Sequence, residues 1–200
     1  MEHRNIAQQK PCDEGAAKPG EAHVAVRLLK QRTVMLTGEI SQESAESVIE
    51  KLLLLNEEAP GKPIKLFINS PGGDVDGGYA MYDVIRFIEA PVNMIVAGLA
   101  ASAAVIVLLA SPRERRFSLP NARYLIHQPS TGVRGTASDI QIEASEIIKI
   151  REKTNKLISD ETGRPVEQVV KDTHRNYWMG AKESVEYGLI GKVVTTAKEI

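Results

Sequence analysis

Short aliphatic and β-branched runs alternate with helical patterns along the chain from Val26 onward. The segments TVMLTG, IKLFINS, VNMIVAG and ARYLIHQ predict strands, and LIGKVV predicts a late one. Between them, QESAESVIEKLLLLNEEA (capped by Ser41) and YAMYDVIRFIEA predict helices, with PGGDVDGG as a tight glycine-rich turn. SAAVIVLLAS is apolar all round, which predicts a fully buried helix. This repeated strand–turn–helix order predicts an α/β fold with mostly parallel strands.

A long helix is predicted from about residue 137 to residue 160. Thr136 and Asp139 supply an approximate capping box, and the Gly163–Pro165 stretch ends the helix. It carries too many apolar residues for a helix surrounded by solvent, and the pattern leaves open whether it packs on another subunit or on its own sheet. The apolar positions are Ile140, Ala144, Ile147, Ile148, Ile150, Leu157 and Ile158.

Length and composition predict one domain of ordinary size after an N-terminal arm. The polar first 22 residues predict a flexible arm, and residues 23–200 predict a single domain. A formal net charge of −1 gives no electrostatic case for binding nucleic acid or an anionic membrane. Cys12 is the single cysteine, so an intrachain disulfide is excluded and a reducing, cytoplasmic location is favoured. Histidines and acids do not cluster at ligand spacing, so no metal and no other cofactor is expected.

Three predicted strands end in residues that can carry chemistry. NSPGGD, GLAAS and IHQP each follow a strand, and sites in α/β sheets gather at such ends. Ser102, at a strand-to-helix junction, is a candidate nucleophile, although GLAAS lacks the GxSxG pattern and a serine among alanines commonly serves close packing. His127 is a candidate general base or a structural histidine. The SPGG glycines make a tight turn that lets backbone approach a substrate carbonyl.

Four segments together resemble one family. FINSPGGDVDGGYAMYDVIRFI, GLAASAA, RFSLPNARYLIHQPSTGVRGTASDI and MGAKESVEYGLIGKVV resemble ClpP, the proteolytic subunit of the Clp protease, in order and with similar spacing from about Arg27 to Val194. The resemblance implies a crotonase-like α/β fold and seven-subunit rings stacked in pairs as a tetradecamer around a closed chamber. The region 131–160 then resembles the handle that interdigitates between rings. An ATP-driven AAA+ unfoldase would feed unfolded protein into the chamber, and this chain carries no nucleotide-binding motif.

Carried over by position, the resemblance implies a serine peptidase site. Ser102 is implied as the nucleophile and His127 as the general base. The backbone N–H groups of Gly73 and Ala103 are implied as the oxyanion hole. The segment Gly132, Val133 and Arg134 resembles the strand that pairs with a bound peptide. Phe67 and Phe87 match positions of the unfoldase-docking pocket, whereas Lys65 stands where the family often has an aromatic residue.

The chain departs from the family pattern at two functional positions. Asn176 stands where the family's aspartate orients the histidine; its carbonyl can accept from the imidazole but adds no charge, so lower activity of the isolated subunit is expected. Asp172 is the one nearby carboxylate that offers an alternative. His174 stands where the family has an acid that pairs with an arginine like Arg175 across the ring interface, which predicts a weaker homotypic interface and a second ClpP-type subunit as partner.

Two alternatives remain open beside a working peptidase. One is a structural or regulatory ring subunit with a vestigial site, which Asn176 and His174 favour and the intact Ser102 and His127 oppose. The other is a crotonase-type acyl-CoA enzyme sharing the fold and the oxyanion hole, although GLAAS and IHQP match the peptidase branch.

Overall fold

The computed structural model of the chain describes residues 19–130 and 132–200. In this part of the chain the strands form one sheet in which neighbours pair parallel, except for the antiparallel pair β5–β6. The order β1-β2-β3-β4-β7 crosses the sheet, and β5 pairs with both β3 and β6. The predicted α/β fold with mostly parallel strands is confirmed. The strands are β1 (Thr33–Thr37), β2 (Ile64–Ser70), β3 (Val92–Ala101), β4 (Arg116–Ser118), β5 (Arg123–Ile126), β6 (Tyr177–Gly180) and β7 (Lys192–Val193).

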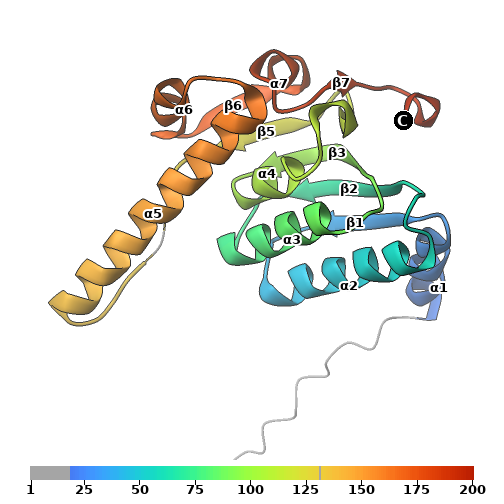
Figure 1. Cartoon of the computed structure of the whole chain (residues 1–200), viewed down its shortest axis with the longest axis horizontal. Coiled ribbons are helices and arrows are strands. Elements are labelled where there is room, and N and C mark those ends of the chain that lie inside the picture. Colours follow the sequence, from blue (N-terminus) through green and yellow to red (C-terminus); the bar gives the residue numbers. More distant parts are fainter. Residues whose placement is uncertain (1–18, 131) are drawn as a thin grey trace, which may run out of the picture.

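The helices surround this sheet and one of them leaves the body. Figure 1 shows α2, α3 and α4 side by side on one face of the sheet, with α6 and α7 near β6. The predicted all-apolar helix is α4, and every residue in it is buried, as expected. The helices are α1 (Pro19–Lys30), α2 (Gln42–Glu58), α3 (Val75–Phe87), α4 (Ala103–Leu108), α5 (Ala137–Thr162), α6 (Val166–Thr173) and α7 (Ala181–Tyr187), with short 3₁₀ turns at Arg113–Arg115 and Ala197–Glu199.

The start of α3 corrects one sequence prediction. The segment PGGDVDGG was expected to be entirely a turn, yet α3 already begins at Val75, and Asp74 caps it by accepting a hydrogen bond from the N–H of Asp76 (2.9 Å). Gly77 and Gly78 therefore lie inside the helix. A Cβ atom on Gly78 would lie 3.2 Å from the carbonyl oxygen of Ala103, so this glycine allows α3 to pack closely on α4.

Other strand and helix boundaries differ from the predicted ones, because strand pairing in the folded chain overrides the local sequence pattern. β3 continues through Gly98 to Ala101, where a strand ending at the glycine was expected. β7 is only two residues long, and the short strands β4 and β6 were not predicted. Residues 19–22 of the predicted 22-residue arm belong to α1; the rest of the arm, with Cys12, lies outside the described residues.

The long helix α5 is capped as predicted and divides into two environments. Thr136 and Asp139 form the reciprocal capping box, and Gly163 ends the helix in the left-handed conformation (φ 74°). The inner end, with Ile158, is buried in the body. The outer end projects away from the sheet (Figure 1), and Ile142 there is 61% exposed. Covering its own sheet is therefore not the role of this outer part.

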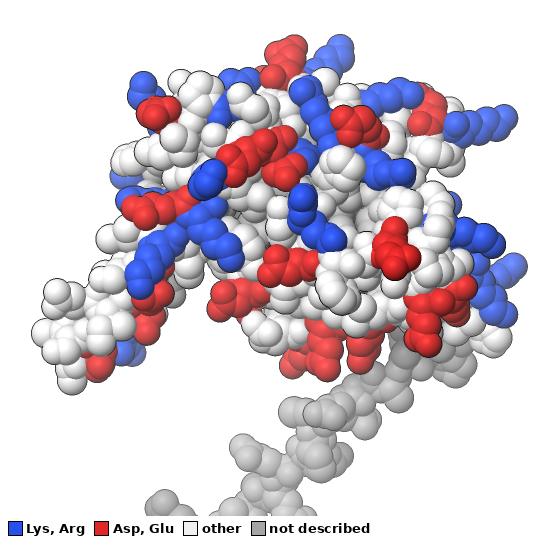
Figure 2. Space-filling model, viewed as in Figure 1, with Lys and Arg blue, Asp and Glu red and all other residues white. Residues whose placement is uncertain are grey.

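Charge on the surface is mixed rather than concentrated. In the face shown in Figure 2, acidic side chains gather along the edge that α2 and α3 occupy, while basic ones are scattered over the opposite part. The tip of α5 is largely uncharged in this view. Among the described residues no helix is both long and apolar enough to cross a bilayer. In the same residues, no three histidine, cysteine or acidic side chains come together as a metal-binding group.

Candidate active site

Ser102 occupies a strained turn between β3 and α4. Its backbone has φ 55° and ψ −124°, a conformation that residues other than glycine rarely adopt. The N–H of Ser102 donates to the carbonyl of Leu125 on β5 (2.9 Å), which fixes the turn to the neighbouring strand. Backbone strain of roughly 1–3 kcal/mol persists only where the surrounding structure enforces it, and it concentrates at functional sites. The turn therefore has the geometry of a nucleophile elbow although the GxSxG motif is missing.

The glycine turn after β2 is pressed against this serine. A Cβ atom on Gly72 would lie 2.6 Å from the carbonyl oxygen of Ala101 and 2.8 Å from the Cβ of Ser102, and Gly72 also has a positive φ of 90°. Gly73 (φ 142°) is packed equally tightly against the backbone of Ile40. No other residue type fits either position without displacing backbone. The sequence marked this turn as a place of close backbone approach, and the structure shows that Gly72 packs against Ala101, Ser102 and Ala103.

Two backbone donors beside Ser102 remain available. Ala103 is the first residue of α4, so its N–H has no acceptor within the helix. No hydrogen bond among the described residues uses the N–H of Ala103 or that of Gly73. The positive end of the α4 dipole also points to this turn. Donors placed in this way can stabilise an oxyanion that forms at Ser102.

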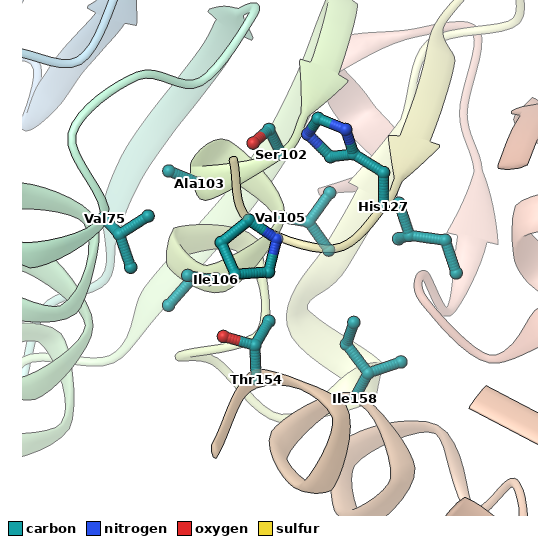
Figure 3. A pocket seen from close by; sticks show the side chains of 10 residues that line it. Val75, Ser102, Ala103, Val105, Ile106, His127, Thr154 and Ile158 are labelled. Atoms are coloured by element: carbon teal, nitrogen blue, oxygen red, sulfur yellow. The ribbon is translucent and has the colours of Figure 1, made fainter. Parts of the chain in front are cut away.

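His127 directly follows β5 and shares a pocket with Ser102. In Figure 3 the imidazole lies beside the serine, whose hydroxyl is directed away from the ring. Nε2 of His127 is buried without a hydrogen-bond partner, although a buried polar atom ordinarily has one. In the described part of the chain no hydrogen bond joins Ser102 to His127. The two predicted residues are thus brought together, but the catalytic hydrogen bond is not formed.

The segment after His127 is tied to the end of α6. The N–H of Gln128 donates to the carbonyl of Thr173 (2.7 Å), and Nε2 of Gln128 donates to the carbonyl of His174 (3.0 Å). The hydroxyl of Thr173 lies 2.8 Å from the amide oxygen of Asn155 on α5, and both residues are buried. This chain of contacts connects the histidine, the end of α6 and the inner end of α5.

The group that would orient the imidazole of His127 is not in place in the structure. Asn176 lies exposed between α6 and β6, and none of the hydrogen bonds of the described residues includes its side chain. The alternative carboxylate is engaged elsewhere, because Asp172 accepts from Gln168 Nε2 (2.7 Å) and from the hydroxyl of Tyr187 (2.9 Å). Burial, together with this bond to Asp172, raises the pKa of Tyr187, so its hydroxyl stays a neutral donor. Asp172 therefore does not replace the missing aspartate.

The pocket at Ser102 is small and mostly apolar. It has a volume of about 30 Å³. Side chains of α3, α4 and α5 and the end of β5 line it, as Figure 3 shows. Such a pocket suits an uncharged side chain held next to Ser102. Its lining includes Val75, Val105, Ile106, Ile126, Thr154 and Ile158.

The predicted peptide-binding and ring-interface residues lie on the surface. Gly132 and Arg134 are exposed, Val133 is half-buried, and the segment belongs to no strand of the structure. His174 and Arg175 are exposed beside Asn176 at the end of α6. The side chains on both segments are therefore accessible in the single chain.

Comparisons with known proteins identify the family. Residues 18–197 match the Clp protease family. The chain belongs to that family. It is 52% identical to ATP-dependent Clp protease proteolytic subunit 2 of Treponema denticola over 174 residues, 87% of either chain. It is 42% identical to proteolytic subunit 3 of Rhizobium meliloti over the whole length of both chains.

A solved structure gives the same result for the fold. A point mutant of ClpP1 from Listeria monocytogenes superposes with a TM-score of 0.82 at 42% identity, covering 88% of this chain and 98% of that one. The ClpP fold inferred from the sequence motifs is confirmed. Membership of a family whose relatives are named proteolytic subunits also confirms a ClpP-type serine peptidase. The alternative of a crotonase-type acyl-CoA enzyme is set aside.

Sequence reasoning found the serine, the histidine and the glycine turn but missed two features. The strained φ of Ser102 follows from packing between β3, β5 and α4, and no local pattern encodes it. Thr154 and Ile158, which reach the pocket from α5, were seen only as part of a long helix. Their spacing of four residues places them on one face of the helix, which is the signal that was available.

Proposed function

We propose that this chain hydrolyses peptide bonds with Ser102 as nucleophile and His127 as general base. The observation that carries the proposal is the strained Ser102, which shares one pocket with His127 and stands beside the unused N–H groups of Gly73 and Ala103. A serine attacking a carbonyl needs these three elements: a hydroxyl, a base and an oxyanion hole.

The reaction follows from these positions. Ser102 Oγ attacks the peptide carbonyl carbon, and its proton passes to His127. The two backbone N–H groups stabilise the negative charge on the former carbonyl oxygen. His127 then gives the proton to the leaving amine, and a water molecule activated by His127 hydrolyses the acyl–serine ester. The Ser102 hydroxyl points away from the ring in the structure, so it must rotate toward His127 before the proton is transferred.

Asn176 takes the orienting position in this proposal and lowers the activity of the isolated subunit. An amide accepts from the imidazole through its oxygen but does not stabilise the imidazolium that forms during attack. The exposed, unbonded Asn176 and the unpaired Nε2 of His127 both support a site that is incompletely ordered in the single chain.

The chain acts, in the same proposal, within a stacked-ring assembly. The outer part of α5 exposes Ile140, Ile142 and Ile148, which is costly for a helix that stays in solvent. Arg175 and its neighbour His174 are both exposed and neither is an acid, which favours a partner ring that supplies one. A bound substrate would add a strand along Gly132, Val133 and Arg134, whose backbone is free of sheet pairing.

We further propose that the protein works in the cytoplasm with an AAA+ unfoldase. The side chain of Phe87 at the end of α3 is 83% exposed, and that of Met35, which pairs with Phe67 across β1 and β2, is 42% exposed; exposed apolar side chains of this kind support docking of an apolar loop. Lys65 lies on the same face of β2 as Phe67 and adds a positive charge beside it.

A structural ring subunit with a vestigial site is the second candidate. It is favoured by one specific observation, the absence of any hydrogen bond connecting Ser102, His127 and Asn176 in the described residues. The assembly would then depend on the same surfaces, but chemistry would come from another subunit.

Labelling with a fluorophosphonate or β-lactone probe, followed by intact mass, distinguishes the two candidates. We expect the chain to gain one probe mass, slowly alone and faster with a second ClpP-type subunit, and to lose labelling in Ser102→Ala. Absence of labelling under both conditions would contradict the peptidase proposal and favour the structural subunit.

A further inference from the structure

The glycine turn beside Ser102 is held by the segment that precedes α2. Ile40 and Gly73 form an isolated parallel bridge. The N–H of Ile40 donates to the carbonyl of Gly72 (2.8 Å), and the carbonyl of Ile40 accepts from the N–H of Asp74 (2.9 Å). These two hydrogen bonds lie on either side of Gly73. The N–H of Gly72 donates to the hydroxyl of the buried Ser70 (3.1 Å), so the N–H of Gly73 is the one that stays available.

The bond between Ile40 and Gly72 decides which way this available N–H points. The carbonyl of Gly72 and the N–H of Gly73 belong to one planar trans peptide unit, so they point in opposite directions. Because Ile40 binds the carbonyl, the N–H is turned away from Ile40. A rotation of this peptide unit would break the bond to Ile40 and displace the proposed oxyanion donor.

The backbone around this bridge does not hold itself in place. Gly38, two residues before Ile40, has a φ of 78°, and Gly73 has a φ of 142°. Glycine adopts such angles, and leaves them, at low steric cost. Residues 37–39 are exposed, so packing adds little there. The buried side chain of Ile40 fixes its own position but not the rotation of the peptide units in the glycine turn. A further contact is therefore needed next to the bridge.

A side-chain hydrogen bond between the starts of α2 and α3 supplies this contact. Nε2 of Gln42, the first residue of α2, donates to Oδ2 of Asp74, the residue after Gly73. The other carboxylate oxygen of Asp74 accepts from the N–H of Asp76 (2.9 Å) and caps α3. A carboxylate only accepts, so the amide nitrogen of Gln42 is the donor. Within the described residues, no other side-chain hydrogen bond joins residues 37–44 to residues 70–78.

We propose that Gln42 and Asp74 are positioning residues for the oxyanion hole of the proposed peptidase. Their hydrogen bond holds the start of α2 against the start of α3, two helices that lie side by side (Figure 1). This keeps Ile40 bonded on both sides of Gly73 and the N–H of Gly73 in one direction. Both side chains act through this backbone and do not touch the reacting atoms. The inference rests on the proposed function, because it concerns the oxyanion that forms at Ser102.

Acylation of Ser102 by a β-lactone tests the positioning role. Ser102 Oγ adds to the lactone carbonyl, the ring C–O bond breaks, and the released alkoxide takes, through His127, the proton that the hydroxyl lost. Intact mass on the full chain gives the limiting rate and the lactone concentration at half that rate. A residue that positions the oxyanion donor changes the first quantity and not the second. Thermal unfolding of each variant shows that it is folded at the assay temperature.

The variants exchange the donor and the acceptor of this bond. Gln42→Glu places a second carboxylate opposite Asp74, and we expect a ~10-fold lower limiting rate, since outright loss of an oxyanion donor costs ~10²–10³-fold. Gln42→Ala removes the bond without adding charge and should cost less, ~3-fold on the same scale. Adding Asp74→Asn to Gln42→Glu restores a bond of opposite polarity, because asparagine still caps the helix and its amide donates to the new carboxylate.

This double variant should recover most of the rate lost in Gln42→Glu, a non-additive result expected of residues in contact. Gln31→Glu is the matched control. Gln31 is exposed and precedes β1, at the edge of the sheet opposite to the strand ends that carry Ser102, so the rate should not change.

The outcomes separate this inference from the proposed function. Unchanged limiting rates in both Gln42 variants, or no recovery in the double variant, would overturn the positioning role and leave the peptidase proposal intact. A higher half-saturating concentration at an unchanged limiting rate would assign the pair to ligand binding and overturn it as well. No acylation of the unaltered chain, alone or with a second ClpP-type subunit, would overturn the proposed function and the inference with it.

Discussion

The Ser102 half of the candidate site is held in place by more contacts than the His127 half. Around Ser102, a strained backbone, a glycine turn within van der Waals contact and two free N–H groups are held together by β3, β5 and α4. Around His127, the imidazole Nε2 has no partner among the described residues and Asn176 is exposed. The proposed nucleophile and oxyanion hole are therefore preorganised by the core of a single chain, whereas the proposed base depends on a surface segment at the end of α6.

This difference has a physical origin. Buried strands and a fully apolar helix fix the serine, because moving it would disrupt close packing. The end of α6 is joined to the body through a few hydrogen bonds, chiefly those of Gln128 with Thr173 and His174. Contacts of this kind are the ones that a neighbouring subunit or a substrate can reinforce. If the proposed roles hold, activity of the single chain is expected to be limited by the histidine and not by the serine.

Asn176→Asp is the strongest test of this difference between the Ser102 and His127 halves of the site. A carboxylate at this position would orient the imidazole and stabilise its charged form, so we expect the rate of probe labelling and of peptide hydrolysis to rise by ~10-fold to ~10⁴-fold, the upper figure being the loss for the reverse change in a serine protease.

The matched control for that variant is Asp172→Asn. Asp172 accepts from Gln168 and Tyr187, so this change should weaken the fold by about 1 kcal/mol without altering the labelling rate. An unchanged rate in Asn176→Asp, with the assembly state unaltered, would show that the orienting group is not what limits the histidine.

On the nucleophile side, Gly72→Ala is expected to lower kcat by ~10²-fold or more, because the added Cβ would displace backbone on both sides of Ser102. Steady-state peptide hydrolysis in the Asn176→Asp background gives the needed sensitivity. Gly61→Ala serves as control, since nothing lies within 4 Å of a Cβ there. Full activity in Gly72→Ala would mean that the turn tolerates movement and that this half is less rigid than the contacts indicate.

A smaller effect is expected for Gln128→Glu, which keeps the shape of the side chain and replaces its donor by an acceptor facing the carbonyl of His174. We expect a fall of ~10-fold in kcat with little change in KM, because the residue positions His127 and does not touch substrate. Gln141→Glu on the exposed part of α5 should change neither value. An increase in KM alone would assign Gln128 to substrate binding instead.

The smallest effect on chemistry is expected for His174→Asp, which supplies an acid next to Arg175. Sedimentation velocity should show a shift from single to stacked rings of the isolated subunit, with at most a few-fold gain in activity. If the distribution of assemblies stays the same, the idea that a partner ring supplies this acid is wrong.

The sequence by itself determined the strand–helix order, the buried α4 and the capped α5. Hydrophobic periodicity, the Ser41 and Thr136 caps and the glycine stop at Gly163 are local signals, and the structure confirms the elements they predict. It also brought forward Ser102, His127 and the glycine turn, because strand ends in a parallel sheet share one edge.

Only the tertiary structure decided how these parts meet. The positive φ of Ser102, the helical place of Gly77 and Gly78, and the arrival of Thr154 at the pocket arise from packing between elements far apart in the chain. The bonds of Asp172 to Tyr187 and Gln168, which remove it from the site, are likewise invisible in the local pattern. Local sequence sets which elements form, but long-range packing sets which side chains face each other, and chemistry depends on the second.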